Sequence, residues 1–244
     1  MSIQVIERLA SLIDVIAQYA EPVTLKILSA ETGLHPSTAF RILASLIEIG
    51  YVERAGEGYR LGVKLTALGR MAGRELDLLQ EAHATLVELR DQSGETVNLT
   101  LREGDEMVYV DRVTSHRMMR VEQLIGSRAP LHVTAVGKLM LGMAGEEAVR
   151  SYAARSGLPR FTANTLVDVD ALLFHCFNAV EQGYALDNEE AELGVGCIGV
   201  LILDSNRQPL AGLSISAPVE RRSLAWIPLL QQASRTIAQR LGYR

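Results

Sequence analysis

The side chains with the clearest chemical potential lie towards the end of the chain. Ser214 and Ser216 stand two residues apart in an apolar run, so on a β-strand their hydroxyl groups would share one face. Cys197 lies in an earlier apolar run between Gly196 and Gly199, and Asp187 precedes that run. Hydroxyl, thiol and carboxyl groups on one sheet face could bind a small polar ligand, although paired serines on a strand can also face solvent.

A second chemical feature is the start of a helix at Thr134. Thr134 is a suitable N-cap, and the first free amides of the helix would then belong to Ala135, Val136 and Gly137. A helix N-terminus presents amide donors and a partial positive charge, so it favours an anion such as a carboxylate. An organic acid is therefore a candidate ligand.

Thiol chemistry is the competing interpretation of the same region. Cys197 could pair with His132 or His175, with Asp187 as the orienting group, as in a thiol-dependent enzyme. No local signature supports this pairing, and Cys197 lies in an apolar run instead of beside cationic groups. The five histidines are scattered, and none has the spacing of a metal pair. We expect no enzyme activity, no metal and no cofactor; a small-molecule-binding or thiol-dependent enzyme domain with an accessory helical domain is the alternative.

Composition and charge limit the classes of protein that fit. The chain has 244 residues, of which 48% are hydrophobic and 22% charged, as in an ordinary globular protein of one or two domains. The longest nearly uncharged apolar run, 194–203, is too short to cross a bilayer, and charged residues interrupt the first apolar positions. Two cysteines suit a reducing compartment, so we expect a cytoplasmic protein without a membrane partner.

The net charge of −5 gives no hint of nucleic-acid binding. Residues 1–75 carry 8 basic and 8 acidic side chains, so this region is neutral, and residues 76–244 carry the whole net charge with 16 basic and 21 acidic ones. Any DNA-binding function must therefore depend on the geometry of a motif.

Such a motif is predicted in the first 62 residues. Apolar periodicity, capping residues and the stops at Pro22, Gly33 and Gly50 predict three short helices. Thr24 is a plausible cap of the second helix, and His35 of the third. Two short aromatic-bearing strands around a Gly-rich turn then predict a β-hairpin. Together these elements, over about 5–16, 25–31, 36–49 and 51–61, form a helix-turn-helix with a wing.

The third helix carries residues that could read DNA. A helix in the major groove contacts base edges through its exposed N-terminal side chains, and Ser37, Thr38 and Arg41 occupy such positions. Phe40 could contact a thymine methyl group or pack on the first helix. The plainer interpretation is that the hydroxyl groups only cap the helix and that the arginine is solvated. The DNA-contacting candidates, with the two arginines that flank the wing, are Ser37, Thr38, Phe40, Arg41, Arg54 and Arg60.

The remainder of the chain predicts a linker and a second domain. Helical periodicity runs over 63–90, with a break expected near Gly73. Alternating strands and helices follow, and Pro228 must start or kink the last helix. The expected strands cover 97–101, 107–113, 184–186, 195–203 and 210–216, and the expected helices 134–143, 146–156, 168–182 and 224–241. We expect an antiparallel sheet, and domain boundaries of 1–62, 63–80 and 81–244.

Several stretches in sequence order resemble the IclR family of bacterial transcriptional regulators. The motif Gly-Leu-His-Pro-Ser-Thr begins the first of these stretches, and Pro-Leu-His-Val-Thr-Ala-Val-Gly-Lys forms a later one. The similar stretches cover nearly the whole chain and lie at 33–43, 46–54, 59–62, 130–138, 183–190, 194–197, 213–218 and 241–244.

The resemblance implies an α+β protein in which a linker helix joins an N-terminal winged helix-turn-helix to a GAF-like antiparallel-sheet effector-binding domain. Family members typically act as dimers or dimers of dimers on palindromic promoter DNA, and they commonly regulate catabolism; repression is favoured here over activation. The positions that match the family's effector site are Val136, Gly137, Asp187, Val195, Cys197, Ser214 and Ser216.

This residue set suggests a class of ligand. It contains no lysine or arginine, so amides and hydroxyl groups would hold the carboxylate of an effector. An ionised Asp187 can only accept hydrogen bonds, so the ligand must also offer a donor. Small hydroxy acids, keto acids whose carbonyl group is hydrated, and hydroxylated aromatic acids meet both conditions.

Overall fold

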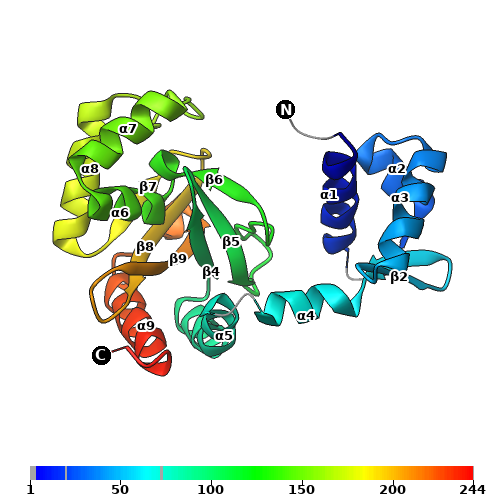
Figure 1. Cartoon of the computed structure of the whole chain (residues 1–244). Helices are drawn as coiled ribbons and strands as arrows, with labels where there is room; N and C mark the ends of the chain where they lie inside the picture. The colour runs from blue at the N-terminus through cyan, green and yellow to red at the C-terminus, as the bar shows by residue number, and fades with distance from the viewer. Residues whose placement is uncertain (1–3, 20, 72–73, 244) are drawn as a thin grey trace. The chain divides into compact units, whose positions relative to one another are not determined.

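The computed structural model describes residues 4–19, 21–71 and 74–243, and Figure 1 shows its elements along the chain. Internal contacts divide the chain into two compact units, Met1–Leu76 and Asp77–Arg244. Helix α5 (Arg74–Ser93) runs across this division.

The N-terminal unit is built from three helices and a small sheet. The buried faces of α1, α2 and α3 meet in one apolar core with Val52 and Tyr59. Pro36 occupies the first turn of α3, where a missing amide costs nothing, and His35 Nδ1 accepts a hydrogen bond from the Ser37 amide. The elements are α1 (Gln4–Ala17), β1 (Val23–Thr24), α2 (Leu25–Thr32), α3 (Pro36–Glu48), β2 (Val52–Ala55), β3 (Gly58–Leu61) and α4 (Val63–Met71).

This arrangement confirms the winged helix-turn-helix and differs from expectation in two places. The side chain of Thr24 makes no capping bond; Thr24 instead belongs to β1, which pairs with β3 and completes a sheet of order β1-β3-β2. The helical region after residue 62 forms two helices, α4 and α5, and the expected break at Gly73 lies outside the described residues.

The C-terminal unit contains an antiparallel sheet of strand order β6-β5-β4-β9-β8-β7. Its strands are β4 (Thr96–Glu103), β5 (Glu106–Val113), β6 (Arg128–Pro130), β7 (Ala185–Asn188), β8 (Val195–Leu203) and β9 (Pro209–Pro218). The other elements are the short 3-10 helices η1 (Leu131–Val133) and η2 (Val219–Arg221) and the helices α6 (Ala135–Ala144), α7 (Glu146–Ser156), α8 (Val169–Gln182) and α9 (Trp226–Arg240). Strands β1 and β6 are absent from the expected set because both are too short to show periodicity.

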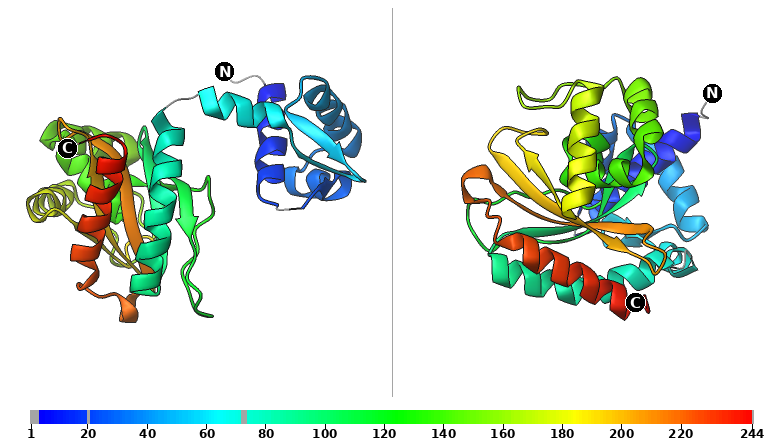
Figure 2. Two further views of the ribbon diagram at one scale, coloured as in Figure 1. Left: turned by 90° about the horizontal axis from the view of Figure 1, so that it is seen from below. Right: turned by 90° about the vertical axis from the view of Figure 1, so that its left-hand side faces the viewer.

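Helices cover both faces of this sheet, as the right-hand view of Figure 2 shows. Helices α5 and α9 pack on one face, and their apolar stripes form the main core with Leu213 and Ile215 of β9. Helices α6, α7 and α8 lie over the other face and enclose a second core around Tyr152 and Leu172. Pro228 lies in the first turn of α9, as expected. The α+β class predicted from the sequence is confirmed.

A β-bulge changes which side chains of β5 face α6. Leu99 pairs with Asp111, but the next residue, Thr100, pairs with Tyr109, so Val110 is left without a partner. An unpaired residue shifts the alternation of a strand by one position. Tyr109 and Met107 therefore face the same side as Thr100, away from the core that α5 and α9 cover.

Candidate functional site

The sheet face beneath α6 holds a cavity of about 510 Å³. This volume suits a small organic ligand. All six strands of the sheet, the first residues of α6, the loop between β5 and β6 and the loop between β7 and β8 contribute to its wall. The lining includes Thr100, Met107, Tyr109, Arg120, Val121, Glu122, Gln123, Arg128, Thr134, Ala135, Val136, Asp187, Glu192, Val195, Cys197 and Ser214.

Two glycines bring the start of α6 to the sheet. A Cβ atom on Gly199 would lie 2.8 Å from Val136 Cγ2, and one on Gly212 would overlap Val136 Cγ1. Thr134 caps the helix, and its Oγ1 accepts a hydrogen bond from the Gly137 amide at 3.1 Å. The Gly137 amide is therefore occupied, and the amides of Ala135 and Val136 are the ones without an intrahelical acceptor.

The polar floor of the cavity lies on β7, β8 and β9, which carry Asp187, Cys197 and Ser214. Cys197 pairs with Ser216 across the two strands, and the Cys197 Sγ and Ser216 Oγ atoms are 2.7 Å apart. Ser216 Oγ also accepts a hydrogen bond of 3.0 Å from Asn98 Nδ2. Its hydroxyl is thus held by two neighbours, and Ser216 does not line the cavity, whereas Ser214, two residues earlier, does.

Burial raises the pKa values of the acidic groups that line the cavity. Burial raises the pKa of Asp187 to about 7, against the bond that its Oδ1 accepts from the Glu190 amide at 2.8 Å. Burial also raises the pKa of the Cys197 thiol to about 12, and, with the nearby Cys197 and Asp187, raises the pKa of the Tyr109 phenol. Near neutral pH the floor therefore offers hydroxyl and thiol groups, and a carboxyl group that can donate or accept.

Arginines lie at the rim, contrary to the expectation of a site without cations. Arg120 and Arg128 both line the cavity. Arg120 Nε lies 3.1 Å from Glu122 Oε2, and Arg128 is paired with Glu103 and Glu106. The rim is therefore charged, but glutamates of the same unit offset the charge of each arginine. The sequence analysis missed both residues because Arg120 lies in a loop and Arg128 in a strand of three residues, and neither segment shows periodicity.

Five of the seven residues expected at the effector site line this one cavity, and two do not. Val136, Asp187, Val195, Cys197 and Ser214 line it, and Gly137 and Ser216 lie behind the lining. The lining residues missed from the sequence include Thr100, Met107 and Tyr109. The alternation of β4 and β5 could have placed them on one face only if the bulge had been known.

The exposed face of α3 carries the residues expected to read DNA. Ser37 and Arg41 are exposed and Thr38 is partly buried. Phe40 keeps 49% of its surface exposed, so it does not pack into the core against α1. The Ser37 hydroxyl lies 2.8 Å from His35 Nδ1, and Arg41 forms no ion pair within the described part of the chain.

The wing formed by β2 and β3 presents the two remaining arginines differently. The Arg54 guanidinium lies over the Tyr59 ring, 5.8 Å from its centroid. Arg60 is paired with Glu53, its cross-strand neighbour. Arg54 therefore packs on an aromatic ring and has no ion-pair partner among the residues that the structure describes, whereas the charge of Arg60 is offset by Glu53.

The geometry opposes thiol chemistry at Cys197. A thiol with a pKa of about 12 is almost entirely protonated at neutral pH. His132 lies in another environment, where its Nδ1 is 2.7 Å from the Tyr152 hydroxyl and its Nε2 is 3.0 Å from the Pro159 carbonyl oxygen. In the described residues, no group of three or more His, Cys, Asp or Glu side chains could hold a metal ion.

Comparisons with known proteins agree with both halves of this description. Residues 5–56 match the model of the IclR helix-turn-helix domain, and residues 70–243 match that of the bacterial transcriptional regulator IclR C-terminal domain. The chain belongs to the IclR family. IclR-family homologues are transcriptional regulators and not enzymes, so the thiol-dependent alternative is set aside.

Three relatives in this family are similar over four fifths or more of their own length. The HTH-type transcriptional regulator XynR of Escherichia coli (strain K12) is 32% identical over 99% of this chain and 98% of its own. KdgR of the same strain is 35% identical over 88% of this chain and 84% of its own. The Transcriptional repressor IclR of that strain is 32% identical over 90% of this chain and 81% of its own.

Solved structures show the same architecture. The Thermotoga maritima IclR superposes with a TM-score of 0.78 at 29% identity, over 98% of this chain and 99% of the other. An IclR homolog from Microbacterium hydrocarbonoxydans, complexed with 4-hydroxybenzoate, superposes with a TM-score of 0.81 at 25% identity, over 98% of this chain and 99% of the other. Within the described residues, no helix of this IclR-family chain is long and apolar enough to span a membrane.

Proposed function

We propose that this IclR-family regulator is a repressor that binds palindromic promoter DNA as a homo-oligomer and releases it when a small organic acid occupies the cavity. The regulated genes are proposed to form a catabolic operon whose substrate or intermediate is the effector. The observation that carries the proposal is the cavity of about 510 Å³, whose floor gathers Asp187, Cys197 and Ser214 beside the α6 N-terminus.

The groups that line the cavity support an organic acid with a second polar function. A carboxylate would accept hydrogen bonds from the Ala135 and Val136 amides and from the Ser214 hydroxyl. Asp187 would bind a hydroxyl group or hydrated carbonyl of the same molecule. One structural relative binds 4-hydroxybenzoate, an acid with this combination of groups. Small hydroxy acids, keto acids and hydroxylated aromatic acids remain the proposed class.

DNA binding is proposed to use α3 in the major groove and the wing on the phosphate backbone. The N-terminal 75 residues are electrically neutral, so a single copy gains little from bulk electrostatics. Two copies on a palindrome bind with a high effective concentration once the first is bound. The dimer or dimer of dimers follows from this requirement. Repression is favoured because several relatives are named repressors.

Ligand binding is tested by thermal shift and calorimetry of the full chain with lactate, pyruvate and 4-hydroxybenzoate. An acid that binds the folded protein raises its melting temperature. Ser214→Ala is expected to weaken binding of the responding acid, because it removes a hydroxyl from the floor. Ser234→Ala is the matched control, since its hydroxyl bonds to the Leu201 carbonyl oxygen under α9. No response to any of the three acids would contradict the proposed ligand class.

DNA recognition is tested by footprinting on the region upstream of the protein's own gene. The expected footprint covers two symmetric half-sites, and light scattering of the complex gives two or four chains per site. Addition of the responding acid should lower the occupancy. A single asymmetric half-site occupied by one chain would refute the palindromic model.

A further inference from the structure

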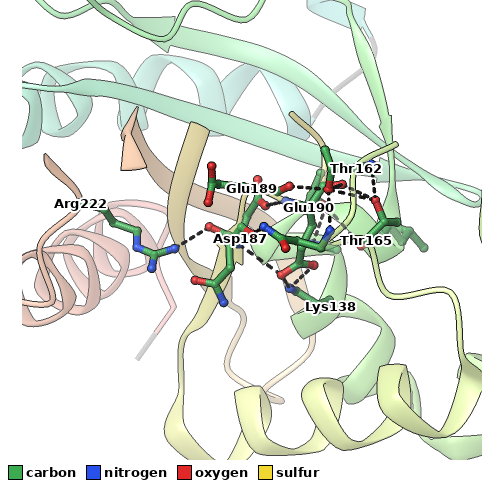
Figure 3. Close-up of polar contacts among 12 residues, drawn as sticks. Lys138, Thr162, Thr165, Asp187, Glu189, Glu190 and Arg222 are labelled. Carbon is green, nitrogen blue, oxygen red and sulfur yellow. Dashed lines mark hydrogen bonds and ion pairs between the residues drawn. The ribbon is translucent and has the colours of Figure 1, made fainter. Parts of the chain in front are cut away.

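Lys138 and Glu190 form a buried ion pair beside the cavity (Figure 3). The Lys138 Nζ atom lies 2.5 Å from both carboxylate oxygens of Glu190, and each residue keeps only 2% of its surface exposed. Neither side chain lines the cavity. Removing two charges from water is costly, and a hydrophobic pair would often stabilise a fold equally well. The pair therefore calls for an explanation other than stability.

The pair joins two segments of the cavity wall. Lys138 lies in α6 two residues after Val136, which lines the cavity together with Ala135. Glu190 follows β7, which carries Asp187, and the Thr165 hydroxyl donates to the Glu190 carbonyl oxygen at 2.7 Å. The ion pair thus fixes the distance between the helix start and the strand that supplies the acidic group of the floor.

Glu190 also orients the Asp187 carboxyl group directly. The Glu190 amide donates to Asp187 Oδ1 at 2.8 Å, and one carboxylate oxygen of Glu190 accepts from the Asn188 amide at 3.3 Å. From the other side, Arg222 donates to the Asp187 carbonyl oxygen at 2.6 Å. Figure 3 shows these contacts converging on the short segment 187–190. A carboxyl group bound at one oxygen in this way keeps the other free for a ligand.

We propose that Lys138 and Glu190 are a positioning pair for the effector site: without contacting the effector, they hold the α6 N-terminus and the Asp187 carboxyl group in binding geometry. This proposal rests on the proposed function of the cavity. It extends that function by naming two residues outside the lining on which effector affinity depends.

The charges of the pair also act on Asp187 in opposite directions. Glu190 raises the pKa of Asp187 and Lys138 lowers it, both after the larger effect of burial. The other groups that face Asp187 are Arg222, which lowers its pKa, and the uncharged Cys197 and Tyr109. Loss of Glu190 alone should therefore make Asp187 a stronger acid, and loss of Lys138 alone a weaker one.

The test is a carboxyl ¹³C NMR titration of Asp187 in the effector-free full chain. We expect its midpoint to fall in Glu190→Gln, to rise in Lys138→Met, and to return towards the wild-type value in the double variant. Glu189→Gln is the matched control, because its carboxylate bonds to the exposed Gly194 amide. Opposite shifts of the Asp187 midpoint would show that the two charges act on the carboxyl group directly. If the substitutions only loosened the packing around Asp187, both midpoints would move in the same direction. A single variant leaves one buried charge without its partner and can fail to fold. The double variant removes both charges, so it can still be titrated in that case.

Affinity for the acid that binds wild type, among lactate, pyruvate and 4-hydroxybenzoate, should fall at least about tenfold in Lys138→Met, or about 1.4 kcal/mol. It should stay within about twofold in Glu189→Gln. Unchanged Asp187 titration in both single variants, or unchanged acid affinity in Lys138→Met, would overturn the positioning role. Failure of wild type to bind any acid would instead refute the proposed effector class, and the NMR result would still decide the role of the pair.

Discussion

The raised pKa of Asp187 predicts that this residue weakens the fold at neutral pH. The variant Asp187→Asn keeps an oxygen that can accept the hydrogen bond from the Glu190 amide, but it cannot ionise. In the wild type, burial raises the pKa of this carboxyl group to about 7, from an ordinary value of 3.8. Its folded-state pKa is raised, so its contribution to stability is fully present below pH 3.8 and is lost as the pH rises through 7.

The size of the effect follows from proton linkage. A difference of one pKa unit corresponds to about 1.4 kcal/mol, so the shift of Asp187 costs the wild type about 4 kcal/mol at pH 8. At pH 5 most of the buried carboxyl groups are protonated, and the cost is about 2 kcal/mol. The stability advantage of Asp187→Asn should therefore grow by at least about 2 kcal/mol between these pH values.

Urea unfolding measures this advantage through the single tryptophan, Trp226, which is part of the main core of the C-terminal unit. Wild type and variant are compared at equal protein concentration, since association contributes to stability. Asp204→Asn is the control, because Asp204 accepts hydrogen bonds from the backbone amides of Asn206 and Gln208 in a surface turn. An advantage of Asp187→Asn that is equal at pH 5 and pH 8 would refute the assignment of a raised pKa.

Three further predictions concern the other parts of the molecule. Arg41→Ala should lower the affinity for promoter DNA by about 1–3 kcal/mol in a fluorescence-anisotropy titration; an equal loss in Arg8→Ala, on α1, would argue against a specific role for α3. Glu95→Gln should destabilise the chain by about 1–3 kcal/mol in urea, because buried Glu95 pairs with Arg221 at 2.7 Å; unchanged stability would show that the pair contributes nothing. Cys197 should resist iodoacetamide at pH 8 until the protein is unfolded, because its thiol pKa is about 12; rapid labelling of the folded protein would contradict its burial.

Much of the fold was readable from the sequence because its signals are local. The Pro-Ser-Thr start of α3 and the glycine after α2 are helix start and stop signals, and their effect depends on a few neighbouring residues. The spacing of Ser214 and Ser216 predicted that their side chains share one face of β9, and Leu213 and Ile215 lie in the core on the other face. The charge balance and the absence of a metal-pair spacing were also properties of composition and order alone.

Other features depend on partners that are distant in the sequence. The bulge between β4 and β5 turns Tyr109 and Met107 towards the cavity, because pairing with the neighbouring strand decides which residue is left out. Ser216 and Ser214 look equivalent in the sequence, yet the hydroxyl group of Ser216 alone is hydrogen-bonded to Cys197 and Asn98. The Lys138–Glu190 pair spans 52 residues.

The sequence by itself therefore determined most of the elements, the helix-turn-helix and the family of the protein, because these depend on residue types at short and regular spacing. Only the tertiary structure decided which polar groups are free to meet a ligand. A hydrogen bond or an ion pair satisfies a group through its position in space, and strands and helices from distant parts of the chain supply those positions.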